Sequence, residues 1–129
     1  MIIQPVIQDI DIYKDRDYSR TYFLKDSVGT AINITDWDFY SQIRPVYGSD
    51  TLVAEFTITT VPASGIVYLN MSHDVTITID IPTPISISSI VTSSNMVWDL
   101  VTNDNTSSRY SLIEGKCTIH ETVTRDVIP

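Results

Sequence analysis

Apolar and polar side chains alternate along most of this chain, in short runs that end at turn residues. The clearest run is 52–60, in which Leu52, Ala54, Phe56 and Ile58 alternate with polar or smaller residues. A period of two places alternate side chains on one face of a β-strand. The run therefore predicts one strand with an apolar face.

Other alternating runs predict the remaining strands. Each is bounded by Gly, Pro, Asn, Asp or Ser, and they lie at 6–13, 18–24, 39–44, 66–71, 96–102 and 109–119. Apolar residues nowhere recur with helical spacing over three turns. About eight or nine short strands at this spacing predict a single all-β domain over 1–129, an antiparallel sandwich or barrel.

The segment 73–95 has a β-pattern of its own. Isoleucines and Val75 alternate with Thr, Asp or Ser on both sides of Pro82-Thr83-Pro84. We expect 75–90 to form an interaction arm that bends at the prolines; an ordinary hairpin added to the sandwich is the alternative. As an arm it would leave apolar side chains exposed unless a partner covers them. The predicted partner interface comprises Ile77, Ile79, Pro82, Pro84, Ile85 and Ile87.

Composition agrees with a β-domain and restricts its partners. Ile, Val and Thr make up 47 of the 129 residues, and such side chains suit strands better than helices. The formal charge of −8 argues against a nucleic-acid partner. A single cysteine excludes an intramolecular disulfide, and we find neither a signal peptide nor a membrane-length apolar run. We therefore expect folding in a reducing cytoplasm.

Residues capable of chemistry are present without a recognisable site. Cys117 and His120 are three positions apart in a predicted strand and so lie on opposite faces, which predicts a core thiol and a surface imidazole rather than a zinc site. Asp9, Asp11, Asp15 and Asp17 cluster in sequence but lack the pattern of a calcium loop. We expect no enzymatic activity, no metal and no cofactor.

The predicted core joins the two sheets. The apolar face of 52–58 is expected to meet Trp98, Leu100 and Ile119 from the opposite sheet. Trp98 is interpreted as a core anchor; an exposed Trp98 would instead mark an interface.

Several stretches together resemble a family of small tailed-phage virion proteins. They are 32–44, 65–72, 98–101, 112–119 and 121–125, the most specific being Leu112-Ile113-Glu114-Gly115-Lys116-Cys117-Thr118-Ile119 with the Thr-Arg that follows. The fold that this resemblance implies is similar to the immunoglobulin-like N-terminal domain of lactococcal phage baseplate upper proteins. The segment 73–95 departs from the family, in which the corresponding link is shorter and partly helical.

The resemblance implies a non-enzymatic structural protein of the virion, docked on a tail, baseplate or neck scaffold beside other virion proteins in multiple copies. A capsid decoration protein on the head is the alternative within this class. A carbohydrate-binding module is the alternative of another class, by analogy of fold alone; it predicts Trp37 or Trp98 exposed on a concave face.

Overall fold

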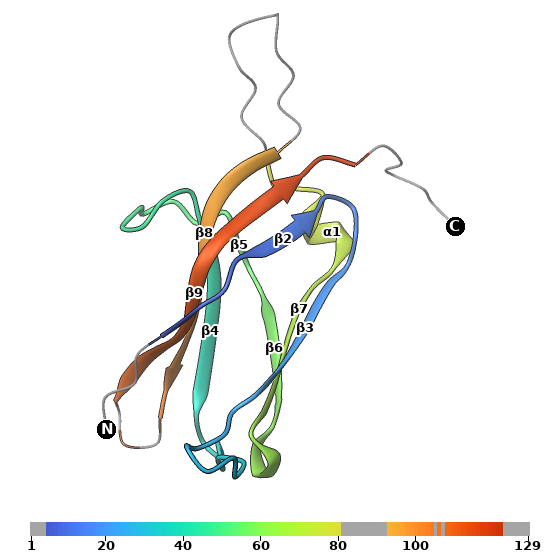
Figure 1. The fold of residues 1–129 in the computed structure, drawn as a ribbon. Coiled ribbons are helices and arrows are strands. Elements are labelled where there is room, and N and C mark those ends of the chain that lie inside the picture. Colours follow the sequence, from blue (N-terminus) through green and yellow to red (C-terminus); the bar gives the residue numbers. More distant parts are fainter. Residues whose placement is uncertain (1–4, 81–92, 105, 107, 123–129) are drawn as a thin grey trace, which may run out of the picture.

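The computed structural model describes residues 5–80, 93–104, 106 and 108–122, which form two facing β-sheets (Figure 1). Sheet A contains β1 (Val6–Ile7), β2 (Ile10–Tyr13), β4 (Asp38–Arg44), β5 (Ala54–Glu55), β8 (Ser93–Asn103) and β9 (Arg109–His120). Sheet B contains β3 (Tyr18–Phe23), β6 (Thr57–Val61) and β7 (Ile66–Met71). The helical turns are η1 (Pro62–Ser64) and α1 (His73–Thr76). The predicted all-β sandwich is confirmed.

The strand order is β1–β9–β8–β4–β5 in sheet A, with β2 also paired to β9, and β3–β7–β6 in sheet B. Every pairing is antiparallel except those of β1 and β2, which run parallel to β9. The wholly antiparallel arrangement expected from the sequence is wrong at this edge. The immunoglobulin-like topology stays a prediction.

The run 6–13 is two strands rather than one, because the chain crosses Gly115 of β9 between them. A Cβ on Gly115 would overlap the backbone carbonyl of Gln8. That carbonyl accepts a hydrogen bond of 2.8 Å from Nε1 of Trp98, and Tyr22 Oη donates to Oε1 of Gln8 at 2.7 Å. At the next residue, Asp9 Oδ1 accepts a hydrogen bond of 2.9 Å from the backbone N–H of Lys116. Gly115 thus gives the β1–β2 connection room to approach β9.

The single strand predicted at 52–60 is also divided, because the chain passes from one sheet to the other at Phe56. The backbone N–H groups of Val53 and Phe56 donate to Ile43 and Ser41 of β4, whereas β6 begins at Thr57 and pairs with β7. Leu52 is 44% exposed, so the prediction that it lies in the core is wrong.

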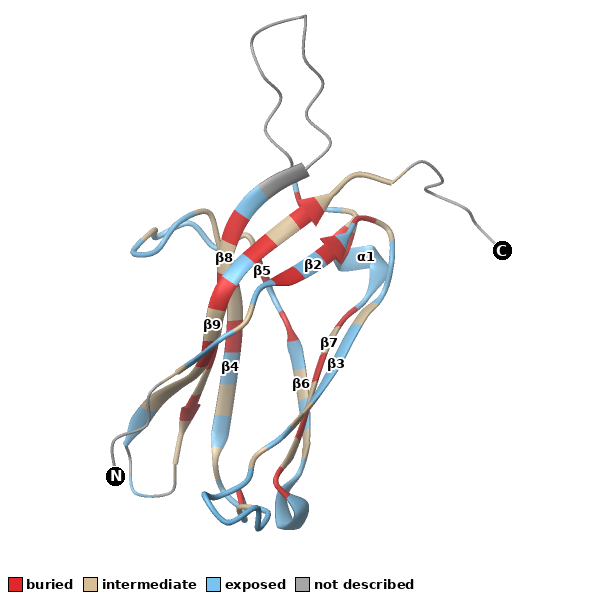
Figure 2. Cartoon of the chain, viewed as in Figure 1, coloured by how far each residue is buried: buried red, intermediate tan, exposed pale blue. Residues whose placement is uncertain are grey.

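The core lies between the two sheets, and buried residues alternate with more exposed ones along β8 and β9 (Figure 2). Trp98 is 1% exposed, and Leu100 and Ile119 are also buried, as predicted. Phe56 is 6% exposed and its ring lies in a T-shaped arrangement with the Trp98 ring, with the ring centroids 6.2 Å apart. Ala54 is buried and Ile58 packs partly buried against the same cluster.

Candidate functional site

The described part of the predicted interaction arm, residues 75–80, is not a strand. Residues 73–76 form α1, and Thr76 and Ile79, three positions apart, are both buried. Ile79 is 1% exposed and belongs to the core, so the prediction that it would be left exposed is wrong. The period-two pattern of this segment was overridden by tertiary contacts: Thr76 Oγ1 donates to the Arg16 carbonyl at 2.9 Å and accepts the Arg16 N–H at 3.2 Å.

Of the other predicted interface residues, the structure describes only Ile77. Ile77 is half-buried beside α1. Pro82, Pro84, Ile85 and Ile87 lie outside the described residues. The interaction arm therefore stays a prediction for those four positions.

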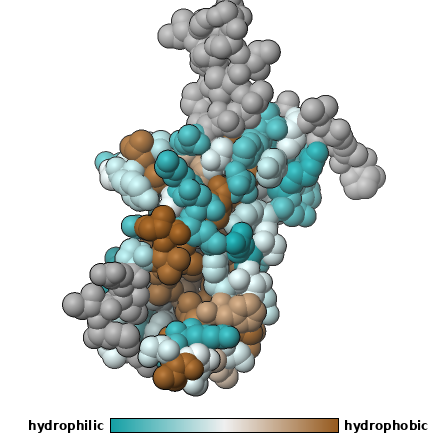
Figure 3. All heavy atoms as spheres, viewed as in Figure 1, coloured by the Kyte–Doolittle hydropathy of each residue, from teal (hydrophilic) through white to brown (hydrophobic). Residues whose placement is uncertain are grey.

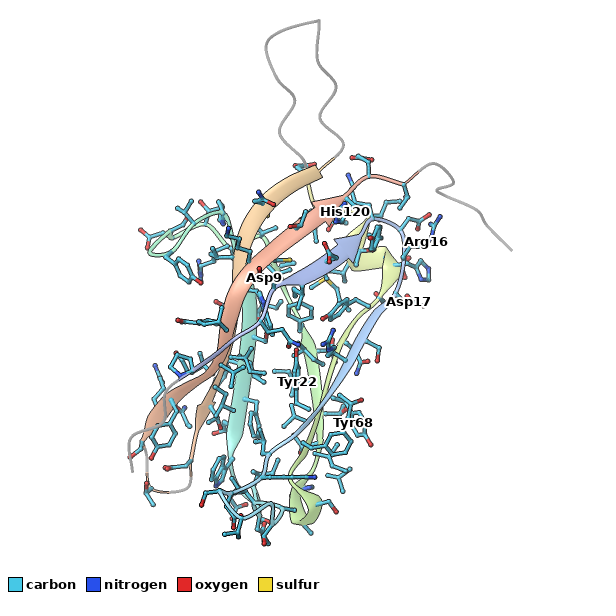
Figure 4. All side chains as sticks on the ribbon, in the orientation of Figure 1. Asp9, Arg16, Asp17, Tyr22, Tyr68 and His120 are labelled. Atoms are coloured by element: carbon cyan, nitrogen blue, oxygen red, sulfur yellow. The ribbon has the colours of Figure 1, made fainter. Side chains whose placement is uncertain are left out.

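Asp17, immediately before β3, holds the N-terminus of α1 from a distant part of the chain. Its Oδ1 accepts the backbone N–H of His73 at 2.8 Å and lies 2.9 Å from Nδ1 of the same histidine. In Figure 4, Asp17 lies beside Arg16 on the turn between β2 and β3. The hydrogen bond to Asp17 and then the charge of Asp74 raise the pKa of His73, and the same hydrogen bonds lower the pKa of Asp17.

Replacing Asp17 with asparagine is expected to lower the pKa of His73 toward the ordinary histidine value. Because the folded-state pKa of His73 is raised, its contribution to stability is present below its unfolded pKa and is lost as pH rises through the folded pKa. The lowered pKa of Asp17 acts in the other direction: its contribution is present above the unfolded pKa and is lost as pH falls through the folded value.

An NMR titration of the histidine ring protons measures this effect. Asp50→Asn, on the exposed β4–β5 loop, is the matched control and should leave the pKa of His73 unchanged. A His73 pKa equal in Asp17→Asn and wild type would contradict the contact.

The two residues proposed as a core thiol and a surface imidazole lie on opposite faces of β9, as predicted. Cys117 is fully buried. His120 stacks on Tyr13 with ring centroids 4.6 Å apart, and its Nε2 lies 2.8 Å from Asp11 Oδ1 (Figure 4). Burial and then the charge of Asp11 raise the pKa of Cys117 to about 12. A thiol in this state is a poor nucleophile.

Native protein is therefore expected to resist alkylation of Cys117 by iodoacetamide at mildly alkaline pH, because the thiolate is scarce and the sulfur is covered. The same reagent should label the thiol completely after unfolding in guanidinium, as measured by mass spectrometry. Equal labelling rates in the native and unfolded protein would show that Cys117 is accessible.

The four carboxylates near the N-terminus do not converge on one point. Each has its own partner: Lys116 for Asp9, His120 for Asp11, Arg16 for Asp15 and His73 for Asp17. Among the residues that the structure describes, no group of three or more His, Cys, Asp or Glu is placed to hold a metal ion.

A shallow hollow on the outer face of sheet A is one feature that the sequence did not reveal. Residues of β4, the β4–β5 loop and β8 line it, and its volume is about 120 Å³. Arg44 donates to Oε1 of Gln42 at 2.8 Å and to the Ser49 carbonyl at 3.1 Å. Partial burial raises the pKa of Asp99, which is paired with Gln42 across the two strands. The hollow is lined by Gln42, Arg44, Val46, Tyr47, Gly48, Val97, Trp98 and Asp99.

This hollow is suited to a protruding side chain of a partner rather than to a substrate. Pockets for small organic ligands usually enclose about 300–1,000 Å³. Val46 and Tyr47 at its rim are well exposed, as is Tyr40 on the same sheet. Its residues come from β4, a loop and β8, so only the β4–β8 pairing brings them together. No sequence motif marks such a site.

The tryptophans do not form the aromatic platform expected of a carbohydrate-binding module. Trp98 is buried, and its indole N–H donates a hydrogen bond to the Gln8 carbonyl. Trp37 is half-buried and packs against the core beside Phe39. Trp98 is thus not available to stack on a sugar, and Trp37 is only partly exposed.

No protein-family model matches this chain, and no curated protein matches it. Within the described residues, none of the helices has the length and apolar character needed to span a membrane. The resemblance to tailed-phage virion proteins therefore stays a prediction that depends on the sequence motifs alone.

Proposed function

We propose that this chain is a non-enzymatic structural module of a tailed-phage virion that docks on a tail, baseplate or neck scaffold. The observation that carries the proposal is the placement of the motifs behind the resemblance. Residues 38–44 of the stretch 32–44, together with the stretches 98–101 and 112–119, lie on β4, β8 and β9, which are adjacent strands of sheet A. Motifs far apart in sequence thus form one continuous structural unit.

Exposed apolar side chains support a docking role. Val6 and Ile7 of β1, at one edge of sheet A, are 63% and 69% exposed. Figure 3 shows hydrophobic side chains at several places on the surface of the molecule. Val6 and Ile7 are adjacent on an edge strand, and contiguous exposed apolar groups mark interaction surfaces more often than scattered ones do.

The state of the reactive groups also supports a structural role. Cys117 is buried with a raised pKa, and His73 and His120 each face an aspartate. Among the described residues, neither imidazole ring has a hydrogen bond to a hydroxyl or a thiol. An acyl-transfer or hydrolytic site needs a nucleophile and a base within hydrogen-bond reach. The partners that we propose are other virion proteins, and the formal charge of −8 disfavours nucleic acid.

The proposal is tested by quantitative mass spectrometry of density-purified particles. We expect the protein in a fixed ratio to the tail or baseplate proteins, in particles and in isolated tails. Recovery with tail-free heads would favour the decoration role on the capsid instead. Absence from the particles would overturn the proposal.

A further inference from the structure

Among the described residues, β6 is an edge strand whose sequence lacks the usual protection against pairing. It forms a ladder with β7 on one side, and in the strand order of sheet B it has no neighbour on the other. Outside this ladder, no backbone hydrogen bond from Thr57–Val61 is found among the described residues. Its sequence, Thr-Ile-Thr-Thr-Val, has no charge, no proline and no glycine.

The other edge strands among the described residues are short or charged. β1 and β5 have two residues each, and β5 includes Glu55. β2 includes Asp11 and β3 includes Arg20. Natural sheets commonly prevent edge-to-edge association with short edge strands and with charges. β6 has five residues and neither device.

The outer face of sheet B, which continues from β6, is free of charge. Thr57, Thr59 and Val61 share this face with their cross-strand partners on β7, whereas Ile58 and Thr60 point to the other side. In Figure 4, Tyr68 of β7 points away from the sandwich on this face. Charged residues are depleted at the centres of protein interfaces and aromatic residues are enriched there. The face comprises Ser19, Thr21, Phe23, Thr57, Thr59, Val61, Ile66, Tyr68 and Asn70.

We propose that β6 pairs antiparallel with β6 of a second copy of this chain, centred on Thr59. The two B sheets then form one six-stranded sheet across a two-fold axis. A two-fold interface must be self-complementary. In this register Thr57 lies opposite the partner's Val61, and Thr59 lies opposite the partner's Thr59.

Charge is the reason for choosing a second copy as the partner. Two chains of formal charge −8 repel each other wherever their carboxylates meet. A ladder limited to Thr57–Val61 brings no charged side chain of either copy opposite another. Glu55 lies two residues before Thr57, beyond the end of this ladder. This pairing does not depend on the virion role proposed above.

Thr59→Lys tests the pairing, with Thr21→Lys as the matched control. Thr59 and Thr21 are both exposed, and both are paired with Tyr68 in one cross-strand row, but Thr21 lies on the opposite edge strand, β3. In the proposed dimer, Thr59→Lys places two lysines directly opposite each other, which is destabilising. The readout is sedimentation equilibrium over a range of concentrations, with circular dichroism to confirm that each variant is folded.

We expect a weak, concentration-dependent dimer for wild type, since a five-residue ladder buries less area than a standard interface. Thr59→Lys should weaken it by about fivefold or more, and Thr21→Lys should leave it unchanged. Mixing Thr59→Lys with Thr59→Glu should restore association by pairing opposite charges. A wild type that remains monomeric to about 1 mM, the weak end of specific affinities, would overturn the proposal. Equal effects of the two lysine variants would overturn it too, since they would place the contact on the face of the sheet rather than at the β6 edge.

Discussion

Replacing Gly115 with alanine is expected to lower the free energy of unfolding by about 3–5 kcal/mol, a large effect for a single methyl group. The new Cβ would overlap the Gln8 carbonyl, so the connection between β1 and β2 must move away from β9. That movement breaks the hydrogen bond from Trp98 Nε1 to Gln8 and leaves a buried indole N–H without its acceptor. Gly115 is also the glycine of the motif 112–119. The close approach of the Gln8 carbonyl gives a physical reason for a glycine at this position.

Chemical denaturation of Gly115→Ala and Gly48→Ala measures this effect. Gly48 has φ +80°, and a Cβ there would meet no atom within 4 Å. Gly48→Ala should therefore cost only the backbone strain of about 1–2 kcal/mol. If the Gly115 variant were no less stable than the Gly48 variant, the close approach of Gln8 would be wrong.

Replacing Phe56 with alanine is expected to cost about 3–5 kcal/mol, the usual range for removing a buried phenylalanine. The Phe56 ring lies between the sheets, with its centroid 5.5 Å from that of Tyr18 in β3 and 6.2 Å from that of Trp98 in β8. It stands where the chain leaves sheet A for sheet B, so the cavity would open at the connection between the two sheets.

Leu52→Ala is the control for this substitution. Leu52 precedes Phe56 in the same alternating run but is 44% exposed, so its removal should cost less than about 1 kcal/mol. Urea unfolding at constant pH gives both values. Similar losses at the two positions would mean that 52–58 is one continuous strand with a single buried face.

Four of the longer strands, β4, β7, β8 and β9, were predictable because each has one buried face and one more exposed face. The runs at 39–44, 66–71, 96–102 and 109–119 correspond to β4, β7, β8 and β9, with ends shifted by a few residues at most. Pro62 and Gly65, residue types that favour turns, separate the runs 52–60 and 66–71, and the chain there forms η1 and ends at Gly65 with φ 66°. Alternation and turn chemistry are local properties, so the sequence carries them directly.

The errors arose where a contact distant in sequence determined the local structure. The alternation at 52–60 continues across the change of sheet, because both halves keep one face toward the same core. The residues at 75–80 alternate like a strand, but Asp17 accepts the backbone N–H of His73 and Thr76 is hydrogen-bonded to Arg16, so the chain forms α1 there. The parallel pairing of β2 with β9 has no local signature, because it joins segments about a hundred residues apart.

The candidate surfaces were less predictable than the fold. Alternation predicts which side chains of a strand face the core. It does not predict which element or partner contacts the outer face or the edge of that strand. The hollow around Asp99 requires β4 beside β8, and the exposed edge of β6 requires the strand order of sheet B. Only the buried state of Trp98 and Cys117 followed from their places in alternating strands.

A cryo-EM reconstruction of the intact particle, at a resolution that traces this chain, is the most direct measurement of the central proposal. The proposed role predicts the β-sandwich at a defined, repeated position on the tail, baseplate or neck, with exposed groups such as Val6, Ile7 and Tyr47 covered by a neighbouring subunit. A complete reconstruction of that scaffold with every density assigned to other chains would contradict it.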